Sequence, residues 1–87
     1  MWKIQWQKPA QKQFIKLDAH LRLRIEKAIN LKLLQDPDIH LIPLVGDLSG
    51  LYKFRGGDYR LLCLKEDDIL IITFVKVKHR KEVYEAE

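Results

Sequence analysis

The spacing of apolar residues changes twice along this chain of 87 residues, and these changes limit the fold more than any other feature. Residues 2–7 alternate between apolar and polar, a period of two that is typical of a half-buried strand. Apolar residues then recur at helical spacing as far as residue 34, and from residue 51 the period returns to two. A strand, then helices, then strands predict an α+β domain with a mostly antiparallel sheet.

Two consecutive helices are predicted between residues 9 and 34. Pro9 suits the first turn of a helix that runs to about Leu17. Asp18 is a good N-cap for a second helix. Pro37 ends that helix, because the residue before a proline avoids helical geometry. The connection is short, so we expect an αα-hairpin. The apolar stripe of the second helix consists of Leu21, Ile25, Ala28, Ile29 and Leu33.

Three strands are predicted after a loop at residues 36–49. Residues 51–55 and 59–65 are joined by Gly56-Gly57, a dipeptide that favours a tight hairpin. Residues 69–75 are apolar on both faces, as expected for an interior strand. The expected order is β-α-α-β-β-β, with a four-stranded sheet, two N-terminal helices on one face, and a short C-terminal helix or tail.

Length and composition restrict the class of protein. A chain of 87 residues is expected to form a single domain over residues 1–87. Its one cysteine, Cys63, cannot make an internal disulfide, which favours a reducing compartment, and its strand position predicts a core residue. The apolar run at residues 69–75 is far shorter than the roughly 20 residues that span a bilayer, and the N-terminus has no signal-peptide pattern. We therefore expect a cytoplasmic protein without a membrane segment.

Charge is distributed unevenly around the net value of +4. Residues 1–34 carry eight Lys and Arg against two acids, residues 35–75 carry four against seven, and residues 76–87 carry four against three. The basic first part indicates an anionic partner, either a phosphate backbone or an acidic protein. A solvated helix surface is the alternative explanation.

The predicted hairpin gathers three cations. A two-residue loop at Gly56-Gly57 would place Lys53 opposite Arg60, with Arg55 on the same face, away from the helices. Like charges directly opposite each other destabilise a sheet by up to about 1 kcal/mol. We therefore interpret Lys53, Arg55 and Arg60 as a phosphodiester site. Alternatively, the long side chains extend into water and Asp58 neutralises part of their charge.

The C-terminal string at residues 76–84 is a second candidate. It combines four cations with the imidazole of His79 and the ring of Tyr84. Cations beside an aromatic ring are typical of single-stranded nucleic-acid binding. A polar tail with Tyr84 folded onto the core is the alternative. The three histidines lie far apart in the sequence and there is one cysteine, so we expect no metal site and no cofactor.

Three strings together resemble the RelE/ParE superfamily of bacterial toxins from type II toxin–antitoxin modules. They are GDLSGLYKFR at residues 46–55, GDYRL at 57–61 and VKHRKEVY at 77–84. The similarity extends over nearly the whole chain and implies the RelE/ParE-like fold. RelE-like members cleave mRNA in the ribosomal A site, whereas ParE-like members poison DNA gyrase.

The RelE-like branch is favoured, which implies a metal-independent endoribonuclease. Such an enzyme uses the ribose 2′-hydroxyl as its nucleophile and needs groups that align it, take its proton and stabilise charge on phosphorus. The motif carries the catalytic roles onto Lys53, Arg60, Arg80 and Tyr84. We hypothesise that Lys53 is the base, Arg60 stabilises the phosphorane, Arg80 or His79 assists the leaving group, Tyr84 stacks on a base, and Arg55, Lys76 and Lys78 bind substrate.

The alternative function is ParE-like inhibition of DNA gyrase without nuclease activity, in which the sheet cations have no catalytic role. For either function the resemblance implies an antitoxin that wraps around the toxin and binds operator DNA as part of that complex. The nuclease additionally implies mRNA and the ribosome, through its rRNA, as partners.

Overall fold

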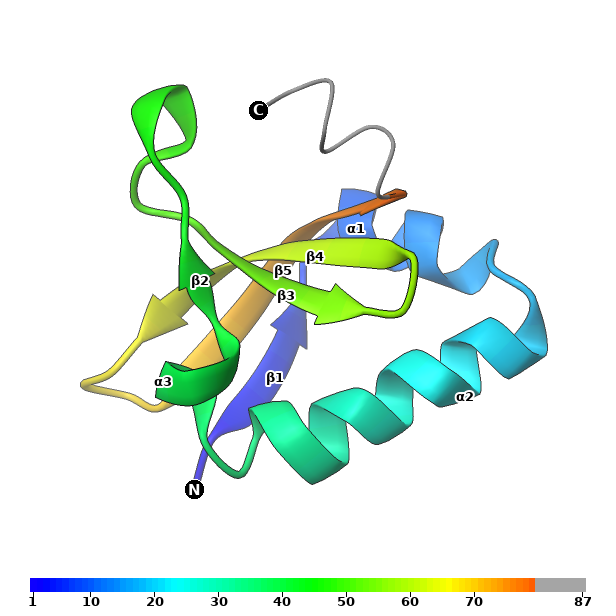
Figure 1. Ribbon diagram of the computed structural model, residues 1–87, viewed down its shortest axis with the longest axis horizontal. Helices are drawn as coiled ribbons and strands as arrows, with labels where there is room; N and C mark the ends of the chain where they lie inside the picture. Colours follow the sequence, from blue (N-terminus) through cyan, green and yellow to red (C-terminus); the bar gives the residue numbers. More distant parts are fainter. Residues whose placement is uncertain (80–87) are drawn as a thin grey trace.

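The computed structural model describes residues 1–79 (Figure 1). Within these residues the sheet has five strands, and all but one of its neighbouring pairs are antiparallel. The exception is the pair formed by the first and last strands, which run parallel to each other. This arrangement confirms the predicted α+β class and the mostly antiparallel sheet, while the predicted C-terminal helix or tail at residues 80–87 lies outside the described residues. Across the sheet the order is β1 (Lys3–Trp6), β5 (Ile71–His79), β4 (Tyr59–Glu66), β3 (Tyr52–Gly56) and β2 (Ile42–Pro43).

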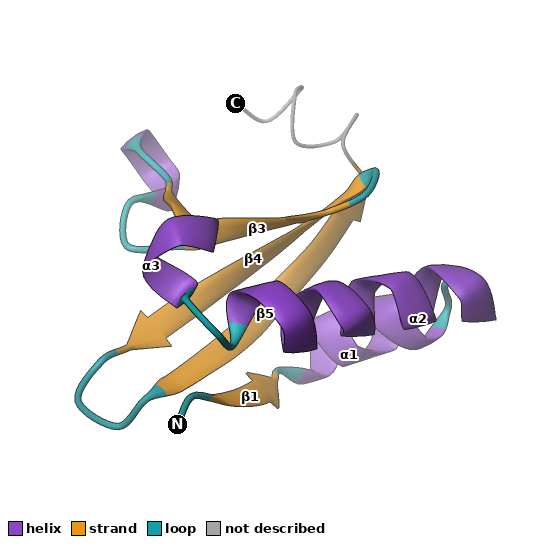
Figure 2. Cartoon of the chain, turned by 60° about the horizontal axis from the view of Figure 1, so that its bottom comes forward, coloured by secondary structure: helices purple, strands orange, loops and turns teal. Residues whose placement is uncertain are grey.

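The two predicted helices are present and cover the same face of the sheet (Figure 2). α1 (Lys8–Ile15) has its proline in the first turn. α2 (Ala19–Ala28) has Asp18 at its N-cap. The side chain of Asp18 makes no capping hydrogen bond, but its carbonyl oxygen accepts hydrogen bonds from the N–H groups of Leu21 and Arg22. α2 continues as the π-helical turn η1 (Ile29–Leu33), so together they match the predicted length of the second helix.

The core lies between these helices and the sheet. Trp6 joins its layers, because its ring centroid lies 4.7 Å from those of Phe14 in α1 and Phe74 in β5. Cys63 is fully buried, as predicted, and burial raises the pKa of its thiol to about 12. The other large side chains that are fully buried are Ile25, Leu33, Leu61, Ile72 and Phe74.

Residues 36–49 form more than the predicted loop. They contain the short helix α3 (Pro37–His40), strand β2 and the 3₁₀ turn η2 (Gly46–Leu48), which form an arm beside β3 (Figure 1). β2 pairs with β3, with Ile42 opposite Lys53. The expected four-stranded sheet is therefore wrong by one strand. A strand of two residues, one of them proline, is too short to produce an alternating pattern.

Candidate functional site

The hairpin turn between β3 and β4 lies one residue later than predicted. Its loop is Gly57-Asp58, and Arg55, rather than Lys53, lies opposite Arg60. Gly57 has φ of +62°, which a type II′ turn requires at its first loop position. The predicted Lys53–Arg60 pair is thus wrong. The predicted face is right, because moving a two-residue loop by one position changes every partner by two residues and keeps the alternation.

Arg60 is a buried cation held in a fixed orientation. Its side chain leaves the residue 8% exposed, and its Nη1 donates to the carbonyl oxygens of Gly57 at 3.2 Å and Tyr59 at 3.1 Å. Neutral carbonyls orient a guanidinium without cancelling its charge. The turn therefore presents one positive group whose position does not depend on a ligand.

Lys53, Arg55 and Arg60 line one hollow with a volume of about 190 Å³. Its fourth lining residue is Ile42 from β2, which is 53% exposed. A neighbouring hollow of about 400 Å³ extends along residues 42–48 and also includes Lys53. The sequence gives no signal for Ile42, because the strand that carries it is too short to recognise. The three hairpin cations predicted to act together are thus brought together by the fold.

A β-bulge determines which residues of β5 join these cations. The register shifts between Leu62 and Cys63, so that Val75 is the extra residue in β5. Before the shift Phe74 points into the core, and after it Val77 does. In an uninterrupted strand, with Val75 paired in the ladder, Lys76 would share the face of Phe74.

Because of the bulge, Lys76 and Lys78 lie opposite Leu62 and Arg60 and share the face of Arg60. His79 lies on the other face, where its ring contacts the ring of Tyr59 edge-on at a centroid distance of 5.3 Å. The sheet therefore separates His79 from the Arg60 guanidinium. We call Lys53, Arg55, Arg60, Lys76 and Lys78 the cation face. The predicted site residues Arg80 and Tyr84 lie outside the described residues.

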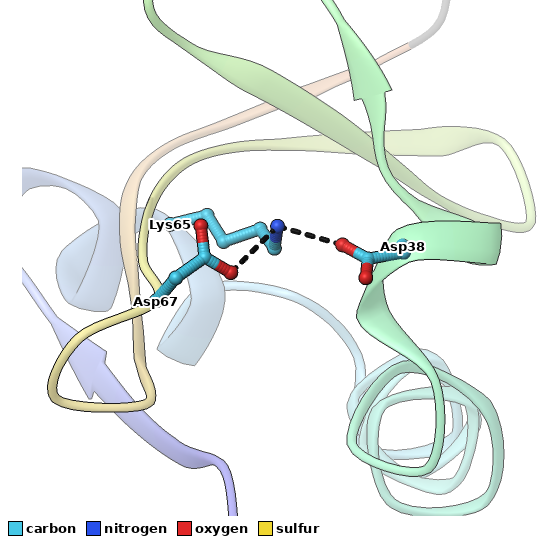
Figure 3. A network of polar contacts seen from close by, with 3 residues as sticks. All are labelled: Asp38, Lys65 and Asp67. Carbon is cyan, nitrogen blue, oxygen red and sulfur yellow. Dashed lines mark ion pairs between the residues drawn. The ribbon is translucent and has the colours of Figure 1, made fainter.

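A second charged cluster, around Lys65, lies on the helix-covered side (Figure 3). Its Nζ is 2.6 Å from Oδ1 of Asp38 in α3 and 2.9 Å from Oδ1 of Asp67 in the β4–β5 turn. The hydrogen bond to Asp38 raises the pKa of Lys65 most, and the hydrogen bond to Asp67 raises it further. The Nζ also lies 5.8 Å from the ring centroids of Trp2 and Tyr52. The cluster ties α3 to the sheet at the start of the arm that carries Ile42.

Residues 1–79 do not gather three His, Cys, Asp or Glu side chains where a metal ion could be held. Over the same residues, no helix has both the length and the apolar character that a membrane span requires.

Comparison with solved structures shows the same fold in several bacterial toxins. The RelBE2 toxin–antitoxin complex from Mycobacterium tuberculosis contains a chain with 24% identity and a TM-score of 0.83, covering 91% of this chain and 98% of that one. The isolated RelE toxin of Escherichia coli has 24% identity and a TM-score of 0.74, and the match covers 99% of this chain and 94% of that one. A chain of the YoeB–YefM complex from Staphylococcus aureus has 17% identity and a TM-score of 0.68, and the match covers 91% of this chain and 97% of that one.

Among curated proteins none matches this sequence significantly. The family model for the ParE toxin of the type II toxin–antitoxin system parDE, however, matches residues 4–84. Apart from Lys3, the first residue of β1, that match covers the strands and helices described above, together with every predicted site residue. The chain therefore belongs to the ParE toxin family of type II toxin–antitoxin systems, within the RelE/ParE superfamily.

Proposed function

We propose that this toxin is an endoribonuclease that cleaves mRNA without a metal ion. The observation that carries the proposal is the fixed, buried Arg60 beside Lys53 and Arg55 in one hollow. Cleavage of a phosphodiester builds extra negative charge on the phosphorane oxygens in the transition state. Positive donors that are already oriented stabilise such charge without reorganising at the moment of reaction.

The reaction needs no nucleophile from the protein. The ribose 2′-oxygen attacks the adjacent phosphorus, a new P–O2′ bond forms, and the P–O5′ bond breaks to leave a 2′,3′-cyclic phosphate and a 5′-hydroxyl. Lys53 accepts the 2′-hydroxyl proton, Arg60 stabilises the phosphorane and Arg55 positions the backbone. Lys76 and Lys78 add substrate contacts on the same face.

The proton for the leaving 5′-oxygen and the contact to a neighbouring base fall to Arg80 and Tyr84, as the superfamily pattern implies. His79, proposed from sequence as an alternative acid, lies on the face opposite Arg60. We therefore assign the leaving-group role to Arg80 alone and a packing role against Tyr59 to His79.

Two partners accompany this function. The principal dimensions of the molecule, 33 × 29 × 23 Å, suit entry into the ribosomal A site, where we propose that mRNA is presented together with rRNA. We also infer a cognate antitoxin, because the similar chains from Mycobacterium tuberculosis and Staphylococcus aureus are described as parts of toxin–antitoxin complexes. Operator DNA is then bound through that complex, and the site of action is the cytoplasm.

The test uses the purified toxin on a message in a translating extract, and on naked RNA in EDTA. We expect cleavage in the extract that leaves a cyclic phosphate. Arg60→Ala should lower the rate about 10²–10³-fold, as expected for loss of one transition-state donor, and Lys53→Ala should also lower it. Lys12→Ala, an exposed lysine of α1, is the matched control. Unchanged cleavage after Lys53→Ala combined with Arg60→Ala would overturn the assignment.

Inhibition of DNA gyrase is the second candidate, and the match to the ParE family model favours it. In that case the message stays intact and supercoiled DNA incubated with gyrase accumulates breaks. The two functions differ in what Arg60 does. A gyrase poison that acts through protein contacts elsewhere retains its activity after Arg60→Ala, whereas the nuclease loses it.

A further inference from the structure

The helix formed by α2 and η1 lines a different hollow on each side of its buried stripe, Ile25, Ile29 and Leu33. On one flank, Glu26 and Asn30 line a hollow of about 170 Å³ beside β1 and α1. The other flank faces the β3–β4 hairpin, and its residues follow the i, i+3, i+4, i+7, i+8 spacing of a single helix face. They are Arg24, Lys27, Ala28, Leu31 and Lys32.

This basic flank and the hairpin enclose a groove of about 330 Å³, here called the basic groove. Its other wall consists of Arg55, Gly56 and Gly57. The hairpin approaches α2 closely, since a Cβ at Gly56 would lie 3.2 Å from Cγ1 of Ile25 and one at Gly57 would lie 3.9 Å from Cδ of Arg24. Two residues without side chains therefore form a wall of backbone between cations.

The basic groove and the cation face meet at Arg55. Arg55 lines the groove and also lines the hollow that contains Lys53 and Arg60. A single exposed side chain at the rim of the hairpin thus belongs to both surfaces. A linear polyanion that occupies the hollow and continues past Arg55 enters the groove, where it meets Arg24, Lys27 and Lys32.

We propose that the basic groove binds the sugar–phosphate backbone of RNA as a continuation of the cation face, an inference that rests on the proposed function. Three cations repeat along one helix face, and a nucleic acid strand repeats its charge at every nucleotide. Among residues 1–79, those that line the groove include no aromatic side chain on which a base could stack, so we expect binding there to be independent of base sequence. The proposed RNA substrate occupies the hollow that contains Arg60, so the same strand can extend into the groove. An acidic protein partner would not be linked to that hollow in this way.

The experiment measures binding of a 2′-O-methyl RNA oligonucleotide, which lacks the nucleophile and stays intact, at a series of salt concentrations. The groove variant combines Arg24→Ala, Lys27→Ala and Lys32→Ala. The control variant combines Lys8→Ala, Lys12→Ala and Lys16→Ala, which removes the same charge from exposed positions of α1 and the residue that follows it. Circular dichroism and urea unfolding verify that both variants fold.

Each phosphate contact to single-stranded nucleic acid contributes about 0.7 to the slope of log affinity against log salt. We therefore expect the groove variant to lower the magnitude of the slope by about 2 and to weaken binding at low salt at least tenfold, with little change in the control. Equal losses in the two variants would show that only overall charge matters and would overturn the proposal. So would unchanged RNA binding together with lost binding of a poly-glutamate peptide, which would indicate an acidic protein partner.

Cleavage kinetics separate this proposal from the proposed function. In an active nuclease the groove variant should raise KM with little change in kcat, whereas Arg60→Ala lowers kcat. An active nuclease whose groove variant keeps the parent slope and KM refutes the groove and leaves the function standing. A protein that cleaves no RNA but shows the expected loss of slope refutes the function and leaves the groove standing.

Discussion

The β4–β5 ladder has two halves, divided by the bulge at Leu62 and Cys63. The halves differ in which face carries the cations and in whether carboxylates pair with them. In the half that pairs residues 63–66 with 71–74, Lys65 lies on the helix-covered side and forms ion pairs with Asp38 and Asp67. In the half that pairs residues 59–62 with 76–79, the cations lie on the opposite face, and the hydrogen bonds of Arg60 go to neutral carbonyls.

This difference shows that one pair of strands can hold a cation either with or without neutralising its charge. Carboxylates hold Lys65 and neutralise it, so its charge contributes to joining α3 to the sheet. Carbonyls hold Arg60 and leave its charge available to an anion. The bulge at Val75 separates the two arrangements, because it interrupts the alternation and places every later residue of β5 on the face opposite to the one it would take in an uninterrupted strand.

Replacing Val77 gives the largest expected effect. Because the bulge leaves Val77 on the core side of β5, where it is 5% exposed, Val77→Lys would place an ion in the core. Burying an ion costs several kcal/mol, and the whole stability of a small domain is about 5–15 kcal/mol. We expect this variant to lose its cooperative unfolding transition in urea. Val75→Lys, at the unpaired and less buried residue of the bulge, should retain it, and a stably folded Val77→Lys variant would show that Val77 does not face the core.

Replacing Arg60 tests the half in which no carboxylate pairs with the buried cation. Arg60→Ala should reduce cleavage about 10²–10³-fold, measured in single-turnover reactions at saturating RNA. Arg60→Lys should recover part of this loss at most, since an ammonium keeps the charge but not the planar donors that reach two carbonyls. Full activity of Arg60→Lys would mean that charge alone, without orientation, is sufficient.

Replacing Lys65 tests the neutralised half. Lys65→Met keeps the apolar stem but removes two ion pairs and the positive charge near Trp2 and Tyr52. Because both carboxylates are well exposed, with side-chain exposures of 77% and 71%, we expect a loss of about 1–2 kcal/mol in unfolding free energy. Cleavage measured well below the unfolding midpoint should be nearly unchanged. A loss of cleavage as large as that of Arg60→Ala would contradict the division between the halves.

The fold could be read from the sequence wherever an element was long enough to show its period. Both helices, β3, β4 and the buried part of β5 are confirmed within a few residues, because several apolar positions repeat in each. β2 cannot be predicted, because two residues have no period. The predicted turn lies one residue early, because Gly56 and Gly57 are both acceptable in a turn by composition. The choice between them depends on Gly56 packing against Ile25, a tertiary contact.

The candidate site could be predicted in part, for a related reason. Alternation was sufficient to place Lys53, Arg55 and Arg60 on one face, since it survives the shift of the turn. The facing of Lys76, Lys78 and His79 depends on a bulge, which leaves no mark in the apolar pattern because Val75 is itself apolar. The roles of Arg80 and Tyr84 stay predictions.

The smallest effect at neutral pH is expected at Cys63, the first residue of β4 beyond the bulge. Burial raises the pKa of its thiol from 9.0 to about 12. The native thiol therefore stays protonated where the unfolded thiol ionises, so the unfolded state binds fewer protons and stability falls as pH rises above 9. The loss is at most about 1.4 kcal/mol per pH unit and ends near the native pKa. Below pH 9 it is absent.

Comparing urea unfolding of the parent and Cys63→Ala between pH 7 and 11 isolates this contribution, because lysines and tyrosines titrate equally in both proteins. We expect the difference in unfolding free energy to be constant below pH 9 and to change in favour of Cys63→Ala above it. Iodoacetamide should modify the parent at pH 8 in urea but not in its folded state. Rapid modification of the folded protein would place Cys63 near solvent and would imply that the strand opens at the bulge.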